Sequence, residues 1–168
     1  QFVICFFCLF YAFFSYFILG RGKTKTNVLF SLIVLSVAFW ALFLGFFIST
    51  KDLGDALIYA DIYYIFAAII PTLFFLFTIY FNSNKKFSKK NLISLIPMII
   101  IIGAFLFDKN LLLKEIFFFG DGTKGVILNK EMYLGYVVYF LFFVFLAYYN
   151  LINSYKKAGE ELAKLQFK

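Results

Sequence analysis

Two long uncharged segments, separated by only a few residues, constrain this chain more than any other feature. Residues 26–50 contain no charged side chain, and neither do residues 62–84. Each segment exceeds the roughly 20 apolar residues that a helix needs to cross the hydrocarbon core of a bilayer. Backbone polar groups in lipid must be satisfied within the chain, so apolar runs of this length are helices. The short connection predicts that the two helices form an antiparallel pair.

The composition of the whole chain is also that of a membrane protein. Of its 168 residues, 64% are hydrophobic and only 15% are charged, which differs from the usual balance of a soluble domain. The net charge of +7 does not indicate a nucleic-acid partner, because the basic residues lie in short loops between apolar segments. We therefore expect the lipid bilayer to be the partner and the plasma membrane to be the location.

The apolar segments predict one all-α integral membrane domain over residues 1–168, a five-helix transmembrane bundle. The expected helices are 2–19, 27–50, 56–81, 91–107 and 132–155. Two β-prone runs around Asp121-Gly122 predict a small external hairpin at 115–129, between the fourth and fifth helices. Residues 156–168 carry charges and helically spaced apolar residues, and predict an amphipathic tail. The chain begins with Gln1 and ends without a helix cap, so we expect truncation at both ends.

The distribution of basic residues predicts the orientation of this bundle. Eleven of the 16 Lys and Arg residues lie in segments 21–25, 85–90 and 156–168, which fall on one side of a five-helix bundle. The other five lie at Lys51 and in segment 109–130. Lys and Arg are enriched in cytoplasmic loops. This asymmetry predicts an external N-terminus, an external hairpin and a cytoplasmic C-terminal tail.

Four residues of the two long helices are candidates for binding a ligand or responding to a signal: Asp61, Tyr64, Trp40 and Pro71. Asp61 is the only carboxylate inside an apolar segment, and a carboxylate at membrane depth suggests a function because it is costly to bury. However, helix 56–81 is longer than a single span requires. The favoured interpretation places Asp61 at the outer interface, facing the bundle beside Tyr63 or Tyr64, and the alternative is a buried functional carboxylate.

Pro71 and Trp40 lie deeper in their segments. Proline has no N–H to donate to the carbonyl of Ala67, so we expect a bend in mid-helix. Trp40 could line a ligand pocket, although a packed or lipid-facing aromatic side chain is the commoner explanation. Small residues at positions 41, 45 and 49 recur every four residues and predict a face that another helix can approach closely.

Several chemistries are excluded by the residues that the sequence lacks. There is no histidine, so Ser–His or Cys–His catalysis and a histidine metal site are impossible. The apolar segments contain no pair of carboxylates and no lysine, which excludes a di-acid metal site and a retinal Schiff base within them. We predict no enzymatic activity, no cofactor and no metal.

A few residues and the order of the elements point to a known family. The stretch FSLIVLSVAFW ends at Trp40, and YADIYYIFAAIIP ends at Pro71. A basic loop, a short helix, an external hairpin and a further helix follow. This arrangement resembles five of the seven helices in the N-terminal seven-transmembrane region of bacterial sensor histidine kinases. The resemblance implies a signal-input module joined to a kinase or other output domain, with self-association through that domain, and it specifies no ligand.

Two functions remain consistent with these observations. The favoured one is a membrane-embedded sensory input module of a two-component system, without its catalytic domain. The alternative is a fragment of a small multi-pass transporter or a structural membrane protein. Transporters tend to have broken helices at matching positions of two repeats. Pro71 and Pro97 are not at matching positions, which favours the sensor.

Overall fold

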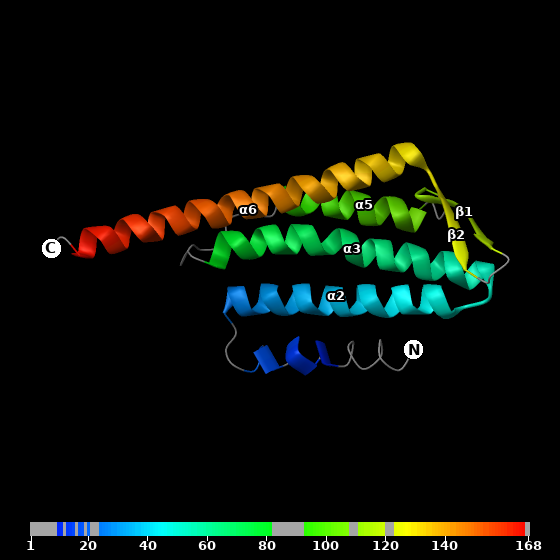
Figure 1. Ribbon diagram of the computed structural model, residues 1–168, viewed down its shortest axis with the longest axis horizontal. Coiled ribbons are helices and arrows are strands. Elements are labelled where there is room, and N and C mark those ends of the chain that lie inside the picture. Colours follow the sequence, from blue (N-terminus) through cyan, green and yellow to red (C-terminus); the bar gives the residue numbers. More distant parts are fainter. Residues whose placement is uncertain are drawn as a thin grey trace.

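The computed structural model confirms an all-α membrane fold with a small antiparallel hairpin (Figure 1). It describes residues 24–81, 93–107, 111–119 and 123–166, together with 10, 11, 13–15, 17, 18 and 20, and it describes side chains as far as Lys156. The basic loop after residue 81 and the Asp121-Gly122 turn lie outside the described residues.

Helices α2 (Lys25–Ser49) and α3 (Leu53–Phe81) form the expected antiparallel pair, and each is long and apolar enough to span a membrane. Their starts are fixed by side-chain caps, which satisfy N–H groups that have no partner within the helix. The Thr24 hydroxyl accepts from the backbone N–H of Asn27 at 3.2 Å, and the Asp52 carboxylate accepts from that of Asp55 at 2.9 Å. Both helices therefore begin slightly before the apolar segments that predicted them.

Helix α6 (Lys130–Gln166) is one continuous helix of 37 residues. It crosses the predicted boundary between a helix at 132–155 and an amphipathic tail at 156–168 without a break, as far as Gln166. Residues 156–158 are Lys, Lys and Ala, which favour a helix and do not end one. At 1.5 Å per residue the helix is about 55 Å long. Its apolar part is Lys130–Lys156, and the remainder projects past the ends of α2 and α3 (Figure 1).

The fourth predicted helix, 91–107, is shorter than expected. A 3-10 helix, η1 (Ile93–Leu95), leads into α5 (Ile96–Phe107), which has 12 residues. Pro97 explains this start, because it has no N–H to donate to the carbonyl of Ile93 and is tolerated in a first turn. An α-helix of this length covers about 18 Å, less than a bilayer core of about 30 Å. Three described helices have full transmembrane length, and the count of five spans stays a prediction.

The hairpin covers the ends of α2 and α3, at the end of the bundle opposite the C-terminus of α6 (Figure 1). Strand β1 (Leu113–Phe118) pairs antiparallel with β2 (Lys124–Leu128). Leu113 and Ile116 of β1 are buried with Phe47, Ala56 and Ala60 of the two helices. Strict alternation would place Leu113 and Ile116 on opposite faces, because they are three apart. The register shifts between Leu113 and Glu115, and this irregularity accompanies the burial of both side chains.

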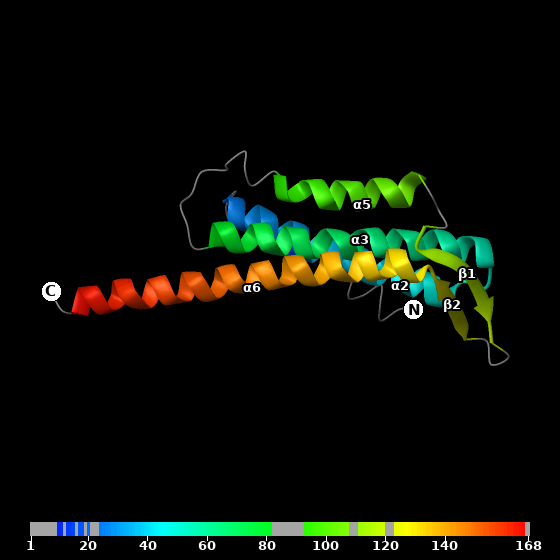
Figure 2. The ribbon, with the colours of Figure 1, turned by 90° about the horizontal axis from the view of Figure 1, so that it is seen from above.

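Helix α3 is the centre of the molecule. It contacts α2, α5, α6 and β1, and Figure 2 shows it lying between α5 and α6. The described residues between 10 and 20 are all helical. One of them, Ser15, is joined to Ser31 of α2 by two hydrogen bonds. The Ser15 hydroxyl donates to the carbonyl of Ser31 at 3.0 Å, and the Ser31 hydroxyl donates to the carbonyl of Ser15 at 3.2 Å. Of the predicted small-residue face of α2, only Gly45 is fully buried, and Ala41 and Ser49 are half-buried.

Candidate functional site

The most polar contact within the helix bundle joins α6 to the middle of α3. The Tyr139 hydroxyl donates to the carbonyl of Ala68 at 2.7 Å and lies 2.6 Å from the Thr72 hydroxyl oxygen. Since its single proton points to Ala68, the Thr72 hydroxyl is the donor in the second hydrogen bond. Tyr139 is 8% exposed and Thr72 is fully buried, so both bonds lie away from solvent.

A second tyrosine repeats this contact one turn away. Tyr136 donates its hydroxyl to the carbonyl of Tyr64 at 3.3 Å. Tyr64 and Ala68 are four residues apart on α3, and Tyr136 and Tyr139 are three apart on α6, so each pair lies on one helix face. We call Tyr64, Ala68, Thr72, Tyr136 and Tyr139 the tyrosine contact. Because a carbonyl oxygen has two lone pairs, the hydroxyls can bind it without breaking the helix.

Pro71 lies next to the tyrosine contact and is completely buried. Helix α3 continues through it from Leu53 to Phe81 without an interruption. The expected bend at this position stays a prediction. The Tyr139 hydroxyl supplies one extra hydrogen bond to α3, at the carbonyl of Ala68, which is the neighbour of the Ala67 carbonyl that loses its donor to proline.

The aromatic ring of Tyr64 extends the site toward α5. Its centroid lies 4.4 Å from that of Tyr63, 5.7 Å from that of Tyr136 and 6.4 Å from that of Phe105. These distances fall in or near the range for favourable aromatic pairs. Tyr64 thus contacts α5 with its ring and α6 with both its ring and its carbonyl.

The other sequence candidates take different positions. Asp61 is 9% exposed and faces the protein interior, one turn before Tyr64 and next to Ala60 of the core beneath the hairpin. This placement is at the hairpin end of α3, and its role stays a prediction. Trp40 is half-buried on α2 and is not part of the tyrosine contact. Tyr64 is therefore part of the tyrosine contact, Pro71 is its sequence neighbour on α3, and Trp40 lies outside it.

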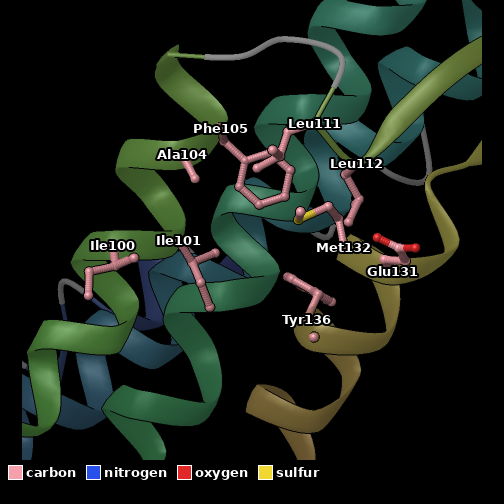
Figure 3. Close-up of a pocket in the computed structure, with 10 residues that line it drawn as sticks. Ile100, Ile101, Ala104, Phe105, Leu111, Leu112, Glu131, Met132 and Tyr136 are labelled. Carbon is pink, nitrogen blue, oxygen red and sulfur yellow. The ribbon is translucent and has the colours of Figure 1, made fainter.

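A cavity of about 230 Å³ lies between α5 and the first turns of α6 (Figure 3). Its lining is mostly apolar, and Glu131 and Tyr136 are the lining residues with a polar side chain. Glu131, Met132 and Gly135 are exposed, so the cavity is open along α6. Phe105 of α5 and Met132 of α6 lie near each other at the cavity in Figure 3. The lining residues are Ile100, Ile101, Ala104, Phe105, Leu111, Leu112, Glu131, Met132, Gly135 and Tyr136. Tyr136 therefore belongs both to this cavity and to the tyrosine contact.

A lysine fastens the hairpin to the end of α2. The Lys124 ammonium donates to the carbonyl of Phe47, and to that of Ile48 at 3.2 Å. It also lies 5.2 Å from the centroid of the Phe47 ring. The last carbonyls of a helix have no partner within it and carry partial negative charge, so a cation is stabilising there. Burial lowers the pKa of Lys124, because packing of the hairpin removes water from the ammonium.

Comparison with known protein families decides the class of this molecule. The family model for the N-terminal 7TM region of histidine kinase matches residues 2–165. The chain belongs to this family. Comparisons with curated proteins and with solved structures found no match. The family confirms the resemblance drawn from the sequence, and with the three long apolar helices it establishes a multi-pass membrane protein.

Sequence reasoning about this seven-transmembrane region missed the cavity and most of the tyrosine contact. Tyr136 and Tyr139 lie in a helix with four further tyrosines, and tyrosines are common at membrane interfaces. A usable signal was the spacing of Tyr136 and Tyr139, which places two hydroxyls on one face of a membrane helix. Within the part of the chain that the structure describes, no three metal-ligating side chains come together.

Proposed function

We propose that this chain is the signal-input module of a histidine-kinase sensor. It receives a stimulus at the end that carries the hairpin and passes a change in helix packing to the opposite end. The asymmetry of basic residues supports an external N-terminus and hairpin and a cytoplasmic C-terminal end of α6. Phosphotransfer and self-association belong to an output domain in this proposal, and the input region itself is not an enzyme.

The continuity of α6 is the observation that carries the proposal. Its first two turns line the cavity, its second and third turns form the tyrosine contact with α3, and its last turns project beyond the bundle. No loop interrupts the helix from Lys130 to Gln166. A shift or rotation of α6 at the hairpin end is therefore transmitted along its whole length.

The contacts of α6 suit an equilibrium between two packings. Lipid is as apolar as the helix surfaces, so helix association in membranes depends on close packing and on hydrogen bonds. Measured hydrogen bonds between membrane helices average about 0.6 kcal/mol. Changing two such bonds alters an equilibrium by about an order of magnitude. A stimulus needs only a modest preference for one packing to shift the population.

A chimera tests the proposal. The chain is fused through α6 to a histidine-kinase core, together with the family's remaining helices, and autophosphorylation is measured in membrane vesicles. We expect Tyr139→Phe, Pro71→Ala and deletion of residues 115–129 each to change kinase output. The matched control is Tyr149→Phe, since Tyr149 is exposed on the same helix and should leave output unchanged.

Two outcomes would count against the input module. One is kinase output that is indifferent to all three changes while expression and membrane insertion are normal. The other is solute flux through the purified chain in liposomes, which would support the transporter alternative instead.

A further inference from the structure

We infer that the cavity between α5 and α6 is a binding site for a small aromatic or aliphatic primary ammonium ion. Its volume of about 230 Å³ exceeds the roughly 150 Å³ of an apolar cavity that holds benzene. The available space therefore suits a ring with a short side chain. Isoleucine, leucine and phenylalanine side chains supply an apolar environment for that part of the molecule.

The two polar residues of the lining indicate which polar group the bound molecule should carry. The Glu131 carboxylate can only accept hydrogen bonds, and it makes no hydrogen bond or ion pair with any residue that the structure describes. The Tyr136 hydroxyl donates its one proton to the carbonyl of Tyr64, so its oxygen can only accept a further hydrogen bond. A lining that offers acceptors, a negative charge and no donor is complementary to an ammonium group, which has three N–H donors.

The aromatic lining favours the same head group. Phe105 and Tyr136 both line the cavity, with ring centroids 6.4 Å apart and planes at 85°. A cation near the face of either ring gains a favourable interaction with its π electrons. An alcohol of the same shape lacks this attraction, and a carboxylate is repelled by Glu131. The expected order of affinity is ammonium, then alcohol, then carboxylate.

Occupation of this site would act directly on the tyrosine contact. A molecule in the cavity would contact Tyr136, whose hydroxyl joins α6 to α3. The bound molecule can thereby raise or lower the stability of one alignment of α6 along α3. This regulatory step rests on the proposed function, whereas the binding itself does not.

The experiment measures binding to the whole chain in lipid nanodiscs by saturation-transfer NMR. The probes are phenethylammonium, 2-phenylethanol and 3-phenylpropionate, which differ mainly in the head group. Gly135→Leu is the blocking variant, because Gly135 lines the cavity and a side chain started there meets open space. Gly103→Leu is the matched control: it adds the same group, also into open space, on α5 at a position that does not line the cavity.

We expect saturable binding of phenethylammonium that Gly135→Leu abolishes and Gly103→Leu preserves. Glu131→Gln, which keeps the shape of the side chain, should weaken phenethylammonium about fivefold, as for a solvent-exposed ion pair. It should leave 2-phenylethanol unchanged. This second variant keeps the test decisive if Gly135→Leu does not fold.

The inference is overturned if 3-phenylpropionate binds as tightly as phenethylammonium, or if the two leucine variants behave alike. Binding without any effect of phenethylammonium on the kinase chimera would uphold the site and remove its regulatory role. Failure of the chimera to respond to Tyr139→Phe, with binding intact, would instead contradict the proposed function alone.

Discussion

Helix α3 places aromatic rings against both α2 and α6, but its buried hydrogen bonds to a neighbouring helix are concentrated at α6. Toward α2 it uses aromatic rings: the centroid of Phe66 lies 4.9 Å from that of Phe39 and 6.0 Å from that of Phe43, in stacked arrangements. Toward α6 it offers backbone carbonyls and a buried threonine to tyrosine hydroxyls. The first interface consists mainly of surface contact, and the second is set by a few directional bonds.

This difference suggests that the α2–α3 interface stabilises the fold and that the α3–α6 interface can adjust. Close packing of large side chains gains many small attractions and tolerates no gap. Hydrogen bonds to successive carbonyls define one register between two helices, and a shift of one turn offers an equivalent set of carbonyls. We therefore expect the α2–α3 pair to behave as a fixed unit and α6 to be the element that moves against it.

The largest loss of stability should come from the fixed pair. Leu76 of α3 is 2% exposed and packs in a cluster with Leu29, Leu73 and Tyr80. Leu76→Ala should cost about 2 kcal/mol, near the lower end for buried leucines because lipid reduces the transfer contribution. Reversible unfolding in mixed micelles measures it. An equal loss for Leu134→Ala, at an exposed position of α6, would show that burial is not the cause.

A slightly smaller effect is expected when the adjustable interface is forced apart. Ala68 is completely buried against Tyr139 and Phe143 of α6. Ala68→Leu should destabilise the fold by about 1.5 kcal/mol through overpacking and should move α6 away from α3. Spin labels at the exposed positions 58 and 145 should report a longer distance between the two helices.

The neighbouring alanine provides the control for this change. Ala67 is only half-buried, so Ala67→Leu should leave the distance between the labels unchanged. The distinction between the two interfaces would be lost if both variants separated the helices equally.

Removal of a single hydroxyl should have a still smaller effect. Tyr139→Phe should cost about 1 kcal/mol, because the freed Thr72 hydroxyl can turn to its own helix and recover part of the loss. Tyr136→Phe should cost about half as much, since its hydrogen bond is longer. Unfolding of both variants, with Tyr149→Phe as the exposed control, measures the order. A larger cost for Tyr136→Phe than for Tyr139→Phe would contradict it.

The smallest effect should be confined to the hairpin. Lys124→Met removes the cation from the C-terminal end of α2 and should cost about 0.5 kcal/mol. Hydrogen exchange should accelerate in β2 and in the last turn of α2, and the tyrosine contact should remain protected. Lys114→Met is the control, because Lys114 is exposed on β1. Equal exchange in the two variants would show that the Lys124 contacts do not hold the hairpin in place.

The elements that follow from local sequence were predictable. Uncharged runs longer than a bilayer core specify α2 and α3 whatever they pack against, because the lipid leaves no alternative to a helix. The hairpin was indicated by β-prone runs on either side of a turn. The sequence left two positions open for Asp61, an interfacial one and a buried one; the structure places its side chain in the protein interior, and its role stays a prediction.

The candidate site was predictable only in part, because its contacts depend on tertiary packing. Tyr64 and Pro71 were identified, but their partner helix was not. Every residue has a backbone carbonyl, so the residue type does not show which carbonyl will accept a hydrogen bond. The pairing of Tyr139 with Ala68 could therefore not be predicted without knowing how the helices pack. The cavity is formed by residues 100–105 of α5 and the first turns of α6, and Gly135 has no side chain to fill it; this meeting of two helices is not visible in the sequence of either. Trp40 stood out by its size alone, and the structure places it elsewhere.

The unbroken course of α6 also fixes an angular relation between distant residues. Each residue turns an α-helix by about 100°, so the direction of any position in the last turns is set relative to Tyr139 by the number of residues between them. One extra residue after Tyr155 would turn everything beyond it by about 100°, whereas seven would return it to nearly the same azimuth. The number of residues between Tyr139 and the end of α6 therefore fixes the rotation of that end about the helix axis. A segment that continues from α6 would inherit an orientation that is set by the contact of the tyrosines with α3.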